Sequence, residues 1–151
     1  MRIRRVLPIL IALIAVAAVS LVPPAAAKKG GGGNGKLLAT FLTGDQEVPG
    51  PGSDTGIGFA ALSLDQGHHT ICVVLQVSGT DTPIAAHIHG GEAGVAGPIV
   101  VHLTPALETG FACIDDVDRS LVKDIRKHPE QYYVNVHTAS FPAGAIRGQL
   151  G

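Results

Sequence analysis

Three histidines in two separate segments have the type and spacing of ligands for a transition-metal ion. His87 and His89 alternate in AAHIHG (residues 85–90), and His137 follows in YYVNVHT (residues 132–138). In a strand, alternate side chains share one face about 6.5–7 Å apart, so two imidazoles can converge on one ion. A third imidazole from a neighbouring strand would complete a three-nitrogen set for copper or zinc with an open position. The alternative is a structural cluster of polar residues, solvated or hydrogen-bonded on a sheet face.

Other polar residues could support such a site. Asn135 or Glu47 could hold a ring nitrogen of a ligand histidine. Arg147 and Gln149 share one face of the last predicted strand, and we expect them to join Asn135 and His137, with Glu47 as the counter-charge of Arg147. If buried, such a network must be fully hydrogen-bonded. The same groups could instead form a pocket for a carboxylate or a sugar, because a guanidinium presents a planar fork of donors.

The remaining reactive residue types point to no other chemistry. His102 is expected to be a lone residue on a polar strand face, and His68, His69 and His128 are expected to be exposed. The sequence has no Gly-x-Ser-x-Gly motif and no Gly-x-Gly-x-x-Gly motif that opens a helix after a strand. We therefore assign no catalytic residue and, apart from the histidines, no cofactor-binding residue.

Short alternating segments must position these side chains. Opposite the histidines, Ile84, Ala86 and Ile88 form an apolar face, as Val134 and Val136 do in the second segment. Asp118 can cap one short helix around residues 118–127. The pattern predicts an all-β fold, an antiparallel Greek-key-like sandwich or barrel of about eight strands. The predicted strands are residues 36–42, 56–64, 70–78, 84–89, 98–104, 109–115, 132–138 and 145–150.

The N-terminal residues predict export. A basic start, an apolar run over residues 6–22 and three alanines at 25–27 are typical of a signal peptide spanning residues 1–27. The rival interpretation is an uncleaved membrane anchor, because the run is near the lower limit for spanning a bilayer. We expect a secreted, extracellular or cell-envelope protein with no stable membrane span after cleavage. A glycine-rich flexible leader (residues 28–35) would then precede one domain (residues 36–151).

Charge and cysteine content narrow the possible partners and the compartment of the protein. Cleavage would remove three of the 11 basic residues and leave eight against 12 acidic residues, a formal charge of −4. This balance argues against nucleic acid or an anionic membrane as a partner. Cys72 and Cys113 are the only cysteines. In an oxidising compartment we expect them to form a disulfide, whereas two free thiols would require a reducing one.

Five segments, taken in order, resemble the CHRD (chordin-type) domain. This family is named after chordin, an extracellular binder of bone morphogenetic proteins, and is common in exported microbial proteins. The resemblance covers residues 36–151 and implies a secreted β-rich domain with no established reaction. Chordin's cysteine-rich modules are missing here, so growth-factor binding is not implied. The segments are LTGDQEVP (42–49), AHIHG (86–90), GPIVV (97–101), YVNVHT (133–138) and PAGAIRGQL (142–150).

A weaker similarity concerns copper/zinc superoxide dismutases. VSG (77–79) followed by AHIH (86–89) is similar to the strand that supplies two copper-ligand histidines in those sandwich enzymes. No loop of further histidines with an aspartate follows His89, and residues 90–97 contain only Glu92 as a metal ligand. The similarity implies a sandwich and does not imply a dismutase.

Two functions follow from these observations. The first is a noncatalytic extracellular or cell-envelope binding or structural module, whose partner would be an extracellular protein or a small ligand. The alternative is a copper- or zinc-binding protein that uses His87, His89 and His137, with oxidoreductase activity as an extension.

Overall fold

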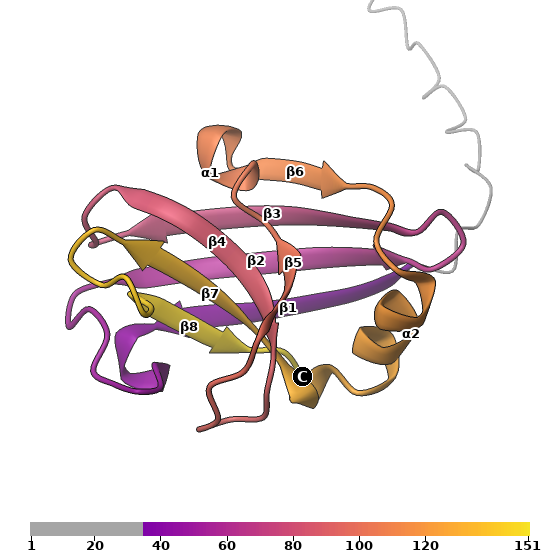
Figure 1. The fold of residues 1–151 in the computed structure, drawn as a ribbon. Helices are drawn as coiled ribbons and strands as arrows, with labels where there is room; N and C mark the ends of the chain where they lie inside the picture. Colours follow the sequence, from indigo (N-terminus) through magenta and orange to yellow (C-terminus); the bar gives the residue numbers. More distant parts are fainter. Residues whose placement is uncertain (1–34) are drawn as a thin grey trace, which may run out of the picture. The chain divides into compact units, whose positions relative to one another are not determined.

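Residues 35–151 are the part of the chain that the computed structural model describes, and they form one antiparallel sheet of eight strands (Figure 1). The signal peptide expected at residues 1–27 and most of the expected leader lie outside these residues. The sheet curls into a nearly closed barrel. The predicted all-β antiparallel class is therefore confirmed, in its barrel form.

The chain runs through the barrel mainly by hairpins, and the spatial order of the strands is β5-β4-β7-β8-β1-β2-β3-β6. The edge strands β5 and β6 are consecutive in the sequence. Helix α1 (Ala106–Thr109) joins them and contacts β3 and β4, so it lies across the open seam. The strands are β1 (Lys36–Thr43), β2 (Ile57–Asp65), β3 (Thr70–Ser78), β4 (Pro83–Gly90), β5 (Ile99–His102), β6 (Phe111–Ile114), β7 (Tyr132–Thr138) and β8 (Ile146–Gln149).

Alternation along β3 shows why these sequences form strands around a core. Ile71, Val73 and Leu75 are buried inside the barrel, while the intervening side chains face outward. Cys72 is directly opposite Cys113 in the β3–β6 register, and the two form the expected disulfide. The disulfide fastens the edge strand β6 to the rest of the sheet.

Helix α2 (Arg119–Lys127) confirms the helix expected at residues 118–127. The Asp118 side chain accepts hydrogen bonds from the backbone N–H groups of Ser120 and Leu121 and so caps the first turn. Val122 and Ile125 bury the apolar side of the helix in the core. Two single 3-10 turns, η1 (Gly44–Gln46) and η2 (Pro129–Gln131), complete the elements. No helix within residues 35–151 is both long and apolar enough to cross a lipid bilayer.

The two sides of the barrel differ in what covers their outer face. Phe41 and Ile57, on β1 and β2, leave their apolar side chains exposed to solvent. On β4, β7 and β8, in contrast, the outer face is polar and is nevertheless buried. His87 and His89 are therefore not solvated, and the burial of this face is compatible with a metal site and with a hydrogen-bonded structural cluster.

Candidate metal centre

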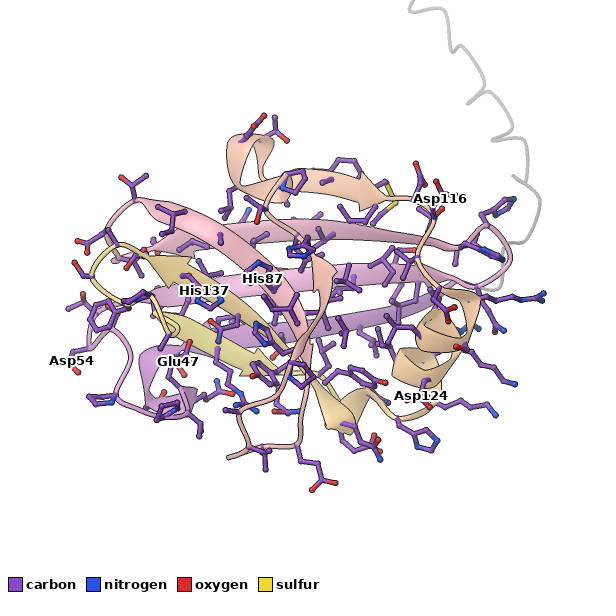
Figure 2. The ribbon with its side chains drawn as sticks, viewed as in Figure 1. Glu47, Asp54, His87, Asp116, Asp124 and His137 are labelled. Atoms are coloured by element: carbon purple, nitrogen blue, oxygen red, sulfur yellow. A yellow bond between two sulfur atoms is a disulfide. The ribbon has the colours of Figure 1, made fainter. Side chains whose placement is uncertain are left out.

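The pairing of β4 with β7 brings the three histidines of the sequence prediction together. His87 is opposite Asn135, His89 is opposite Tyr133, and His137 is opposite Ala85. His137 therefore lies diagonally from His87, two residues along the neighbouring strand. Figure 2 shows the side chains of His87 and His137 close to each other over β4 and β7.

The three imidazoles are close enough to share an ion. The ring centroid of His87 lies 5.6 Å from that of His89 and 5.0 Å from that of His137, and His89 and His137 are 5.9 Å apart. One ring nitrogen from each residue lies within 4.8 Å of the other two. Three imidazoles suit copper or zinc, whereas magnesium and calcium prefer oxygen ligands.

Hydrogen bonds fix the tautomers of two of these rings. Nδ1 of His89 lies 2.9 Å from the carbonyl oxygen of Gly97, and Nδ1 of His137 lies 3.0 Å from that of Pro142. A carbonyl can only accept, so each Nδ1 carries the proton and each Nε2 keeps a free lone pair. Backbone carbonyls therefore hold these two rings, in place of the Asn135 or Glu47 side chains that we expected. Such carbonyls are common partners of metal-ligating histidines.

Each ring also has one buried nitrogen that finds no hydrogen-bond partner among residues 35–151. These atoms are Nδ1 of His87 and Nε2 of His89 and His137. Buried polar atoms are paired in the large majority of cases, so three unpaired nitrogens in one cluster require an explanation. A bound cation would accept all three lone pairs at once.

Burial keeps the rings in the form that binds metal. The side chains of His87 and His89 belong to residues only 8% and 7% exposed. Removal from water, together with the neighbouring imidazoles of His137, His102 and His89, lowers the pKa of His87 to about 4. Burial also lowers the pKa of His89. Both are therefore neutral near pH 7, as ligation requires.

An aromatic stack holds His89 from its other side. The Tyr133 ring lies parallel to the His89 ring at 4.9 Å, and the guanidinium of Arg147 lies 3.4 Å from the Tyr133 ring centroid. The Tyr133 hydroxyl accepts a hydrogen bond from the backbone N–H of Gly97. The sequence prediction omitted Tyr133, although period-two alternation places it on the same face as Asn135 and His137.

Arg147 fastens the loop of residues 91–97 over the polar face. Its guanidinium donates to the carbonyl oxygens of Val95 and Glu92 at 2.9 and 2.8 Å and to Oε1 of Gln149 at 2.9 Å. The residue is 1% exposed. Within residues 35–151 it forms no direct ion pair with Glu47, although the charges of the two residues act on each other's pKa. These donors are used inside the chain, which argues against a pocket for a carboxylate or a sugar.

Glu47 is a buried acid beside this network. Asn135 donates from Nδ2 to Oε2 of Glu47 at 3.1 Å, while Oε1 of Glu47 and Oδ1 of Asn135 are buried without a partner in the described part of the chain. Burial raises the pKa of Glu47 to about 7, although the Asn135 hydrogen bond and the Arg147 charge act to lower it. Gly144, with φ of 148°, makes room: a Cβ there would lie 2.3 Å from Oε2 of Glu47.

The other histidines divide into two groups. His102 is not the lone residue expected, because it is directly opposite His87 in the β4–β5 register with its ring 5.0 Å away. His68, His69 and His128 are exposed, as expected. His68 contacts Asp65, and none of the three belongs to the cluster.

Comparison with known proteins gives one match. The family model of the CHRD domain matches residues 38–150, nearly the whole of the described part of the chain. No curated protein and no solved structure matches the chain.

Proposed function

The chain belongs to the CHRD domain family, and from that premise we propose that it is an exported, noncatalytic module that binds one copper or zinc ion. The ligands are His87, His89 and His137. The observation that carries the proposal is the convergence of two buried imidazoles and one half-buried imidazole, each with one buried nitrogen that has no partner within residues 35–151.

The energetics support a ligand more than a purely structural cluster. A buried polar atom without a partner costs about 1–3 kcal/mol. Three such atoms close together would destabilise the barrel, and nothing would offset this cost if no ligand bound there. An ion coordinated by all three nitrogens removes this cost, and the backbone carbonyls of Gly97 and Pro142 already orient two of the rings.

Two further features support the noncatalytic and exported parts of the proposal. The low exposure of His87 and His89 leaves little surface for a substrate larger than an ion. The disulfide between Cys72 and Cys113 is stable in an oxidising compartment, in agreement with the signal-peptide pattern of residues 1–27.

Metal titration tests the proposal. Equilibrium dialysis followed by elemental analysis should find one Cu(II) or Zn(II) per chain. With free metal at 100 times Kd, mass action stabilises the fold by about 2.7 kcal/mol, which raises Tm by about 10 °C. His137→Ala should abolish the Tm shift.

A matched control removes a histidine outside the cluster. His128→Ala deletes an exposed imidazole remote from the site and should leave both the stoichiometry and the Tm shift unchanged. If the unmodified protein binds neither metal, or if His137→Ala and His128→Ala behave alike, the cluster is structural and the proposal fails.

A further inference from the structure

We infer that His102 is a fourth, mobile ligand that closes the coordination sphere of the ion from the solvent side. The inference depends on the proposed function and specifies it: the ion is held by four imidazoles, with no position left for a substrate.

The register places His102 within reach of the site. His87 and His102 are directly opposite each other on β4 and β5, where Cβ atoms are about 4.5–5.5 Å apart. Their ring centroids are 5.0 Å apart, the same distance as between His87 and His137. His87 is therefore central, with an imidazole neighbour on its own strand and one on each adjacent strand.

The freedom of His102 distinguishes it from the other three residues. His89 and His137 are held by carbonyls, and His87 is packed among the other rings. The side chain of His102 is exposed, and it makes no hydrogen bond within residues 35–151. It is on the edge strand β5, whose register with β4 shifts at Ile88/His89. Rotation about its side-chain bonds can therefore turn a ring nitrogen toward the cluster.

The chemistry explains why a fourth imidazole matters. Zinc favours four ligands in a tetrahedral arrangement, and copper(II) accepts four nitrogens in a tetragonal one. Three imidazoles leave one position open to water or to a substrate. If His102 occupies this position, the ion enters and leaves past an exposed side chain, which suits a protein that holds and releases metal.

Electron paramagnetic resonance of the Cu(II)-loaded protein tests this inference, with sodium azide as the probe of an open position. The unmodified protein should show coupling to four nitrogens and a spectrum unchanged by azide. His102→Ala should show three nitrogens, bind azide, and lose about ten- to a hundredfold in Cu(II) affinity. His128→Ala is the control and should match the unmodified protein.

The outcomes separate this inference from the proposed function. If one Cu(II) binds per chain but the unmodified protein and His102→Ala have the same nitrogen count and azide response, His102 is not a ligand and the three-histidine site stands. If the unmodified protein binds no metal, both proposals fail. Because His102 is exposed, the apo form of His102→Ala should melt at the same temperature as the unmodified protein, which a circular dichroism melt will check.

Discussion

Replacing Glu47 with glutamine should remove part of the pH dependence of stability. Glu47 is 6% exposed, and burial raises its pKa from 4.5 to about 7. The folded state therefore binds the proton more tightly than the unfolded chain does. The stabilisation associated with the protonated acid is complete below pH 4.5 and is lost as the pH rises through 7. Each unit of pKa difference corresponds to about 1.4 kcal/mol, so the loss by pH 8 approaches about 3 kcal/mol.

Glu47→Gln keeps the size of the side chain and the oxygen that accepts from Asn135, but it has no charge to bury. Urea unfolding in the presence of a chelator should give similar stabilities for both proteins at pH 4.5. At pH 8 the variant should be the more stable by about 2–3 kcal/mol, with an unchanged m-value. Asp54→Asn, at an exposed carboxylate, should have the same stability relative to the unmodified protein at both pH values. A difference between Glu47→Gln and the unmodified protein that does not change with pH would refute the reasoning.

Three further predictions concern the metal-free protein. Because the pKa of His87 is lowered to about 4, its contribution to stability should fall by about 1–3 kcal/mol as the pH drops from 6.5 to 4. The stability difference between the unmodified protein and His87→Gln should change by this amount over the same range, and a difference that does not depend on pH would contradict the prediction. Cys72→Ala combined with Cys113→Ala opens a loop of 41 residues and should cost about 4 kcal/mol in urea unfolding, so an unchanged midpoint would be inconsistent with a stabilising disulfide. Asp118→Ala removes the cap of α2 and should lower the midpoint of urea unfolding, whereas an unchanged midpoint would show that the cap contributes nothing to stability.

The strands could be predicted from the sequence because one face of each is apolar. The predicted bounds of β3 and β7 match the structure, since alternation there is uninterrupted over the whole strand. Helix α1 was not predicted: its four residues, ALET, are too few to show a helical period, and the last of them, Thr109, begins the predicted strand 109–115. Gly110 ends the helix in the left-handed conformation, with φ of 79°. A glycine is common at this position, but a single glycine does not by itself predict a helix before it.

The candidate site could be predicted in composition but not in geometry. Alternation placed His87 with His89, yet the position of His137 depends on which strands pair and in what register. The cover over the site depends on backbone carbonyls, such as those that bind Arg147 and His89. Every residue has such a carbonyl, so no side-chain pattern marks the ones that are used. His102 was predicted to be a lone residue because its neighbour His87 is on a different strand, and the sequence does not give the register between the two strands.

We propose that a metal ion occupies the point where the imidazoles of His87, His89 and His137 converge. Anomalous diffraction from crystals grown with Zn(II), recorded on both sides of the zinc absorption edge, tests it most directly. We expect one dominant peak per chain, about 2.0–2.1 Å from one ring nitrogen of each of the three histidines. Peaks found only at exposed residues such as His68 or His128, with the cluster empty at saturating zinc, would contradict the account.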